Sequence, residues 1–109
     1  MTDATTITTF LRDLRQVRRF TDQPVPDDIL SDVLEVARWT GSAKNTQPWH
    51  FLVIRDRDTL RALSEMGNFT AFIAGVPLAI GVVLDGGNAR TEPYDHGRVE
   101  ERIMLAAKA

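Results

Sequence analysis

The sequence contains no cysteine, and its two histidines, His50 and His96, lie far apart. The absence of cysteine excludes disulfides, thiolate metal sites and cysteine nucleophiles. Two distant histidines also disfavour a histidine-based metal site, so we expect no metal; His50, inside a predicted strand, is expected to be half-buried. The most apolar uncharged stretch, residues 71–84, is shorter than the roughly 20 residues of a membrane-spanning helix. We therefore expect no transmembrane segment.

An excess of positive charge is also absent, because the formal net charge is −2. This balance gives no indication of a nucleic-acid partner or of binding to an anionic membrane surface. The N-terminal MTDATTITTF carries an aspartate and lacks the basic and apolar regions of a signal peptide, which predicts a cytoplasmic protein. With 109 residues, 43% of them hydrophobic, the chain has the size and composition of one globular domain.

Apolar residues at helical spacing predict two amphipathic helices near the N-terminus. The first stripe consists of Ile7, Phe10, Leu11, Leu14 and Val17. The second stripe consists of Ile29, Leu30, Val33, Leu34 and Ala37. Pro26 followed by two aspartates favours the start of the second helix, and Gly41 is placed to end it. The connector FTDQPVP is expected to be extended, because residues before proline avoid the helical region.

The rest of the chain predicts two strands and two further helices. Residues 49–54 form a compact apolar strand, and residues 77–84 predict a strand buried on both faces because LAIGVVL is continuous rather than alternating. Between them, Asp58 is positioned to cap a third helix that ends at Gly67. Residues 95–109 predict a final helix. The order indicates an α+β fold, but two strands make a poor sheet by themselves and the last helix has no C-terminal cap, so we expect an incomplete domain.

Residues 41–51, GSAKNTQPWHF, concentrate small and polar side chains before the first strand. A phosphate-binding loop is excluded, because such a loop follows a strand, precedes a helix and has glycine where this chain has Ala43. Two interpretations remain: an ordinary helix-to-strand loop, or a cradle for a polar ligand. The arginine cluster RQVRRF, residues 15–20, leaves a similar choice between a basic helix end and an anion site built from guanidinium groups.

Taken in order, these segments resemble the N-terminal half of the nitroreductase family of flavin mononucleotide (FMN) oxidoreductases. Members of that family carry an RRSxRxF segment, a DxPVP connector, an amphipathic helix and a PSSxNxQPWxF segment that leads into the first strand. The counterparts here are LRQVRRF, TDQPVP, the helix over residues 29–39 and GSAKNTQPWHF. The resemblance continues more weakly through PLAIGVVL and DHGRVEERIMLAA.

The resemblance implies an α+β nitroreductase-like sandwich with helices packed on a central sheet, of which residues 1–109 form a single, partial domain. It implies a homodimer with FMN at the interface and NADH or NADPH as electron donor. The implied activity passes electrons to a nitroaromatic, quinone or similar acceptor by a ping-pong route. No catalytic side chain is expected, because the flavin carries the chemistry. The alternative is a truncated relative that binds flavin or dimerises without catalysis.

The resemblance also assigns FMN contacts to particular residues. These are Arg15, Gln16, Arg18, Arg19, Ser42 and Asn45. Arg18 matches the basic position beside the pyrimidine edge of the flavin, where a cation stabilises negative charge at N1 and the C2 carbonyl. Ser42 and Asn45 match the loop that reaches a flavin held mainly by the other subunit. Residues that select the electron acceptor are expected in Asn68–Phe72 or in segments beyond this chain.

Two positions depart from the family pattern. Leu14 stands where the family has its first arginine, and Gln16 stands where it has serine. Leu14 fits the apolar stripe of the first helix, so we expect it to be buried and unable to hold a phosphate. Arg15, Arg19 or Gln16 are the candidates to replace the lost contacts. Trp49 is expected to anchor the first strand rather than to contact a ligand.

Overall fold

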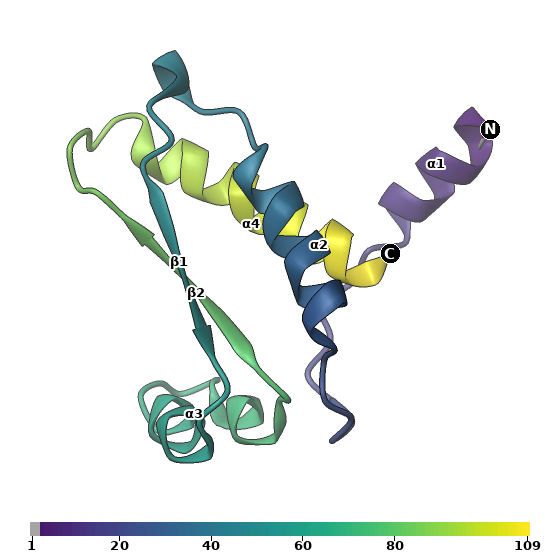
Figure 1. The fold of residues 1–109 in the computed structure, drawn as a ribbon, viewed down its shortest axis with the longest axis vertical. Helices are drawn as coiled ribbons and strands as arrows, with labels where there is room; N and C mark the ends of the chain where they lie inside the picture. The colour runs from purple at the N-terminus through teal and green to yellow at the C-terminus, as the bar shows by residue number, and fades with distance from the viewer. Residues whose placement is uncertain (1–2) are drawn as a thin grey trace.

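The computed structural model describes residues 3–109. Over this range the chain forms four α-helices, two strands and two short 3-10 turns, and the helices and strands follow the predicted order (Figure 1). The bounds are α1 Ala4–Arg12, α2 Asp27–Arg38, β1 Trp49–Ile54, α3 Arg57–Ser64, β2 Ala79–Leu84 and α4 Glu92–Lys108. The 3-10 turns are η1, Ala43–Asn45, and η2, Ala71–Gly75. Within the described residues, no helix has both the length and the apolar character needed to cross a membrane.

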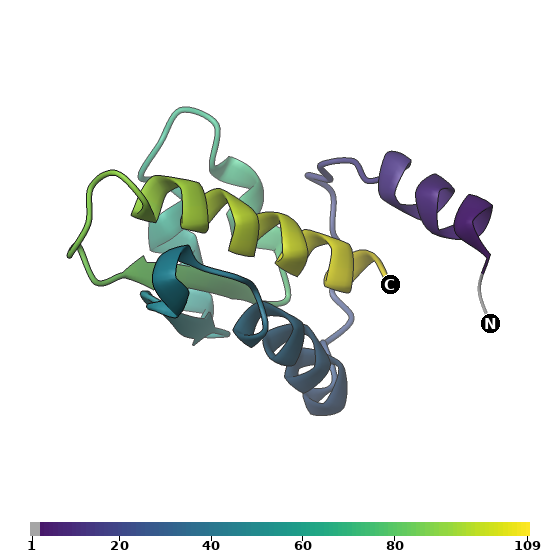
Figure 2. The ribbon, with the colours of Figure 1, turned by 90° about the horizontal axis from the view of Figure 1, so that it is seen from above.

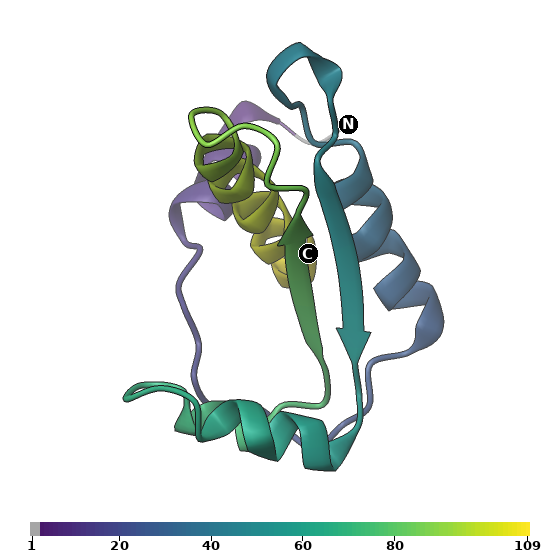
Figure 3. The same ribbon diagram turned by 90° about the vertical axis from the view of Figure 1, so that its left-hand side faces the viewer.

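The two strands form an antiparallel pair, and α3 and η2 connect them at one end. The paired residues are Trp49–Leu84, His50–Val83, Phe51–Val82, Leu52–Gly81, Val53–Ile80 and Ile54–Ala79. Because side chains alternate along a strand, Trp49 and Phe51 share one face of the sheet. Both α2 and α4 lie behind the strands (Figure 3), and the core forms between them and this face.

The core is built from one residue of each neighbouring element. Ala37 of α2 and Val99 of α4 are fully buried, and Trp49 of β1 is 7% exposed. Ile103 of α4 packs against the same cluster. Apolar burial stabilises by roughly 25 cal/mol per Å², so a tryptophan buried here contributes strongly to holding β1 in place. The structural role predicted for Trp49 is confirmed.

The opposite face of the sheet is open to solvent over much of its area. Leu52 is 54% exposed and Val83 is 44% exposed. The prediction that residues 77–84 are buried on both faces is therefore wrong for the described chain, because α2 and α4 lie on the same side of the sheet. The strand also begins at Ala79, two residues after Pro77, which has no N–H to donate to a partner strand.

Helix α1 lies at the edge of the molecule (Figure 2). The Asp3 carboxylate caps it by accepting a hydrogen bond from the Thr6 N–H at 2.8 Å. The helix ends at Arg12, so the prediction that its apolar stripe continues to Val17 is wrong. No side chain of α1 is buried within the described residues. The apolar stripe of this helix therefore packs against little of the molecule. Lys108 joins α1 to α4 by donating to the Phe10 carbonyl oxygen at 2.6 Å.

Helix α2 ends earlier than predicted, at Arg38. Trp39 is its C-cap residue, whereas Gly41 does not have the positive φ of a helix-ending glycine. The Glu35 carboxylate accepts hydrogen bonds from the Arg38 guanidinium and the Trp39 indole, both at 2.7 Å. These contacts lower the pKa of Glu35, with Arg38 as the larger cause. The Trp39 side chain is exposed.

Two other helix starts also differ from the sequence prediction. Asp56, not Asp58, caps α3, because the Asp56 carboxylate accepts from the Thr59 N–H at 2.8 Å. Helix α4 begins at Glu92 rather than at residue 95. Pro93 lies in its first turn, where the missing N–H costs nothing, since that group has no intrahelical partner there.

Candidate functional site

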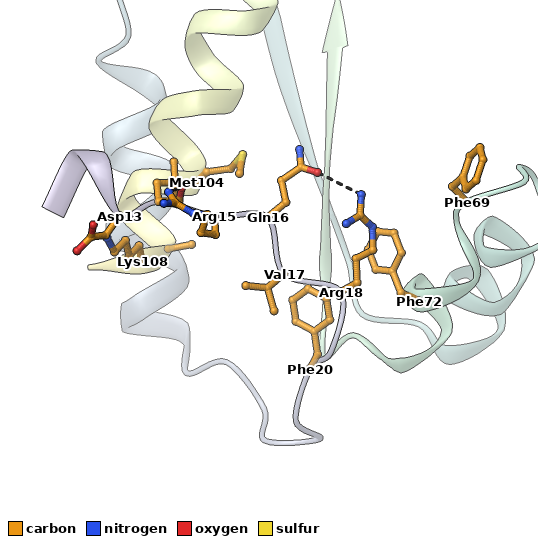
Figure 4. A pocket seen from close by; sticks show the side chains of 12 residues that line it. Asp13, Arg15, Gln16, Val17, Arg18, Phe20, Phe69, Phe72, Met104 and Lys108 are labelled. Carbon is orange, nitrogen blue, oxygen red and sulfur yellow. Dashed lines mark hydrogen bonds between the residues drawn. The ribbon is translucent and has the colours of Figure 1, made fainter. Parts of the chain in front are cut away.

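The arginine-rich segment forms one wall of a cavity of about 700 Å³ (Figure 4). This segment is extended and follows directly on α1, while the C-terminal turns of α4 and the residues around η2 form the other walls. The lining residues are Asp13, Leu14, Arg15, Gln16, Val17, Arg18, Phe20, Phe69, Phe72, Met104, Ala107 and Lys108. The predicted cofactor residues Arg15, Gln16 and Arg18 are thus brought together.

The chemistry of the cavity combines cations with aromatic faces. Phe20 and Phe72 stack with ring centroids 6.2 Å apart, which joins the arginine-rich segment to η2. Arg18 Nη2 lies 3.4 Å from Gln16 Oε1, so the amide oxygen holds the guanidinium along the cavity wall (Figure 4). Lys108 supplies a further cation from the end of α4. Flat aromatic surfaces beside guanidinium and ammonium groups suit a ligand that has a planar ring and an anionic group.

Arg15 and Arg19 differ in their relation to this cavity. Arg15 lines it, although its Nη1 also donates to the carbonyl oxygens of Arg12 at 2.8 Å and Leu14 at 2.9 Å. Arg19 is exposed and does not belong to the lining. The flavin contact predicted for Arg19 stays a prediction, and the cavity geometry favours Arg15.

Leu14 also lines the cavity, but not in the way the sequence suggested. It lies two residues beyond the end of α1 and is half-buried, so it does not belong to a buried helical stripe. Leu14 lies outside the helix because α1 ends at Arg12 and the following residues are extended. Its side chain therefore forms part of the wall that faces the cavity rather than part of a core.

The second predicted cluster, Ser42 and Asn45, lies in the loop of residues 41–47. Ser42 Oγ accepts from the Gln47 N–H at 2.9 Å, and Asn45 Oδ1 accepts from Gln47 Nε2 at 3.1 Å. Lys44, Asn45 and Gln47 have positive φ values of 53°, 55° and 50°. Such values are uncommon for residues other than glycine, so the loop holds a specific shape closed by its own hydrogen bonds. The role of this loop as a cradle for a polar ligand stays a prediction.

The two clusters lie at opposite ends of α4 (Figure 1). The Ala43 N–H contacts Asp95 near the start of the helix, whereas Met104 and Lys108 line the cavity near its end. From Asp95 to Lys108 the helix axis rises by about 20 Å. Within one copy of the chain, Ser42 and Asn45 therefore do not meet the arginine-rich wall.

Several polar features of the structure are not predictable from the sequence. Asp95 and Glu92 are buried carboxylates. Nothing in the sequence marks their burial, because acidic residues are common in the first turns of helices. His50, expected to be half-buried, has a side chain 67% exposed and contacts Asp85 through Nε2 and Oδ1 at 2.7 Å. It lies on the open face of the sheet, because β1 turns Trp49 inward. Among residues 3–109, no group of three or more histidine, aspartate or glutamate residues is arranged to hold a metal ion.

The fold and the cavity define a small α+β domain suited to a flat ligand with a negative charge. The chain belongs to the nitroreductase family, whose model matches residues 11–71, more than half of the sequence. This match begins just before the arginine-rich segment and extends through the 41–47 loop and β1 into η2. The matched range contains the predicted cofactor residues of both clusters.

Two relatives illustrate the match in sequence. The chain is 34% identical over 99 residues to a protein of Archaeoglobus fulgidus provisionally named NADH dehydrogenase/NAD(P)H nitroreductase, covering 86% of this chain and 56% of that protein. It is 46% identical over 57 residues to chloronitrobenzene nitroreductase of Comamonas testosteroni, covering 49% of this chain and 25% of that protein. The chain spans about half the length of the curated relatives it matches.

Solved structures confirm the predicted α+β nitroreductase-like fold. An FMN-dependent nitroreductase of Clostridium difficile R20291 superposes with a TM-score of 0.84 at 28% identity, over 91% of this chain and 58% of that one. A protein of Desulfovibrio desulfuricans, provisionally named a nitroreductase and solved in complex with FMN, gives a TM-score of 0.83 at 27% identity. That superposition covers 98% of this chain and 63% of that one.

Proposed function

We propose that this chain is the N-terminal part of an FMN-dependent oxidoreductase domain. The enzyme would take electrons from NADH or NADPH and pass them to a nitroaromatic, quinone or similar acceptor by a ping-pong route. The observation that carries the proposal is the cavity in which Arg15, Gln16 and Arg18 lie beside stacked aromatic rings. Its volume of about 700 Å³ falls in the range of known ligand sites. The FMN complex of the Desulfovibrio relative supports the choice of cofactor.

The residues of the cavity fit the parts of FMN. Phe20 and Phe72 offer apolar faces to a ring system. Arg15 and Lys108 are cations for a phosphate, to which each would donate through N–H groups other than those bonded to backbone carbonyls. Arg18 would stabilise negative charge at the pyrimidine edge of the ring. Bound FMN supplies the hydride acceptance and electron donation that protein side chains lack. The contribution of this chain is then to bind and orient the ring and to stabilise its charge.

A homodimer is part of the proposal. The predicted contacts are divided between the cavity and the 41–47 loop, which one copy keeps about 20 Å apart along α4. A second copy that brings its Ser42 and Asn45 to the first copy's cavity would complete the site. The cytoplasmic location inferred from the sequence stays a prediction.

Flavin binding and reduction test the proposal directly. The 109-residue chain is titrated with FMN while flavin fluorescence and visible absorbance are recorded, and NADH or NADPH is then added without oxygen. The expected result is saturable binding followed by bleaching of the flavin absorbance. Addition of a nitroaromatic or a quinone should restore the absorbance if that compound is an acceptor. A chain that does not bind FMN would refute the proposal for these 109 residues.

A second candidate is a non-catalytic module that binds flavin or dimerises. It is favoured by the half-length match to the curated relatives and by Leu14 at a position where the family carries arginine. The same titration separates the two candidates. Flavin that binds but is reduced by neither nicotinamide would support the module.

A further inference from the structure

The first turns of α4 carry two buried carboxylates that each hold a loop. Asp95 is 1% exposed, and its Oδ1 and Oδ2 lie 3.3 and 3.2 Å from the Ala43 N–H. Glu92 is 7% exposed and accepts from the N–H groups of Gly86 at 2.7 Å and Asn88 at 2.6 Å. Burying a carboxylate is costly unless hydrogen bonds compensate. Glu92 accepts from two separate N–H groups of its loop, whereas the two oxygens of Asp95 share one hydrogen bond from the Ala43 N–H.

The loop held by Asp95 is the one that carries Ser42 and Asn45. Its left-handed residues, among them Lys44 and Asn45, adopt a conformation that non-glycine residues seldom take and that persists where the surroundings enforce it. Hydrogen bonds inside the loop close it upon itself but do not fix it to the rest of the molecule. The Ala43–Asp95 contact does so, because it joins positions 52 residues apart in sequence.

We propose that Asp95 is a positioning residue that fixes residues 41–47 so that Ser42 and Asn45 are preorganised to contact FMN bound by a partner copy. The inference rests on the proposed function. Asp95 acts through the Ala43 N–H and does not touch the ligand itself. Preorganisation raises affinity because the loop loses less freedom when the ligand binds.

Three variants test this role. Asp95→Leu removes both acceptor oxygens and adds volume at a buried position, whereas Asp95→Asn keeps one oxygen at nearly the same volume. With Asp95→Leu we expect Ala43 amide exchange to become roughly 10- to 100-fold faster relative to the Val99 amide, and the FMN affinity to fall about tenfold. Asp95→Asn should retain both properties to within about threefold, since its oxygen can still accept the hydrogen bond. Glu92→Leu, the matched control, should change neither, because Glu92 holds the other loop.

A variant of the donor keeps the test valid if Asp95→Leu does not fold. Ala43→Pro removes the N–H that donates a hydrogen bond to Asp95. Position 43 is the first residue of η1, where proline is well tolerated. It should lower FMN affinity by the same factor of about ten while the thermal transition is retained.

The outcomes separate the role of Asp95 from the proposed function. If FMN binds and Asp95→Leu changes neither Ala43 exchange nor affinity, the positioning role is overturned while the oxidoreductase proposal stands. Faster exchange with unchanged FMN affinity also overturns it, because the loop would then be held for stability alone. If the wild-type chain fails to bind FMN while Asp95→Leu still accelerates Ala43 exchange, the proposed function fails and the hold on the loop is supported.

Discussion

Arg18 is the cavity residue whose removal best tests the flavin site. Its side chain extends along the cavity wall with one long contact, to Gln16 at 3.4 Å, so it contributes little to folding. Arg18→Ala is expected to weaken FMN binding by about 1.5–3 kcal/mol, the value of a charge-assisted hydrogen bond, with an unchanged melting temperature. Fluorescence titration with FMN measures the first effect and thermal denaturation the second.

Arg19→Ala is the matched control for Arg18→Ala. It removes the same charge one position further on, outside the lining of the cavity. The cavity geometry predicts nearly wild-type FMN affinity for this variant. Equal losses for both substitutions would instead show that general positive charge, not the cavity wall, attracts the flavin.

Leu14→Arg restores the residue type that the family has at this position. Because Leu14 is half-buried at the cavity wall and lies beyond α1, the new guanidinium can reach solvent or a phosphate. We therefore expect a stability change within about 0.5 kcal/mol, together with tighter FMN binding. Urea denaturation and FMN titration measure the two effects. A loss of several kcal/mol would mean that the position is buried, as the helical stripe first suggested.

At the scale of residues, the sequence could reveal the polar members of the site but not its walls. Arg15, Gln16 and Arg18 were identifiable because a motif fixes their spacing. Met104 and Lys108 were not, since they reach the cavity only when α4 returns along the arginine-rich segment. Asp95 was equally hidden, because its burial depends on a loop 52 positions away.

At the scale of elements, the start of α3 offers a clear comparison between two aspartates. Asp56 accepts from both the N–H and the hydroxyl of Thr59, whereas the Asp58 side chain is 90% exposed beside Arg61. Asp56→Ala is expected to lower the melting temperature because the helix loses its N-cap. Asp58→Ala is the control and should leave the melting temperature nearly unchanged. A larger loss for Asp58→Ala would reinstate the cap that the sequence suggested.

The same cap has a defined pH dependence. Hydrogen bonds from the Thr59 hydroxyl, and then from its N–H, lower the pKa of Asp56 below its ordinary value of 3.8. A carboxylate with a lowered folded-state pKa stabilises the fold at neutral pH and loses this effect as the pH falls through that pKa. The difference in melting temperature between wild type and Asp56→Ala should therefore be full at pH 7 and shrink below about pH 4. A difference that does not change between those pH values would contradict the assignment.

Elements were predictable where local chemistry decides them. β1 has the predicted bounds because an apolar run starts with a tryptophan that fills the core. α1 is shorter than its stripe, because periodicity reports which side chains could share a face, not whether another element covers them. η2 was missed, since a turn of 3-10 helix in residues 71–75 has no such period. The start of α3 shifted because Asp56, two positions before Asp58, supplies the side-chain cap.

At the scale of the whole molecule, residues 3–109 form a more open body than a complete domain. The chain exposes 8188 Å², whereas a compact monomer of 12.2 kDa is expected to expose about 6,100 Å². The radius of gyration is 15.2 Å, compared with about 13 Å for a compact domain of this length. The excess of about 2,000 Å² is comparable to one side of a large obligate interface.

Large apolar side chains contribute to this exposed surface. The open face of the sheet presents Leu52 and Val83, and α1 presents Ile7 and Leu11, each 48% exposed. Apolar patches of this kind favour association, because burial stabilises by roughly 25 cal/mol per Å². The 109-residue chain alone is therefore expected to dimerise or aggregate at low micromolar concentration rather than to remain a stable monomer.

Sedimentation velocity at low micromolar concentration measures the self-association of the chain. Two variants that introduce the same charge at different positions test which surface forms the contact. Leu52→Lys adds an ammonium group to the open face of the sheet, and we expect it to weaken association because that charge would have to be desolvated. Met66→Lys, at a position 78% exposed beyond the end of α3, is the control and should sediment like wild type. A monomeric wild-type chain with a cooperative thermal transition would refute the expectation of association. A dimer that is equally stable with Leu52→Lys would mean that the contact between copies lies elsewhere. The arginine-rich wall and the 41–47 loop are then the expected contact surfaces, because a flavin site shared between two copies requires both.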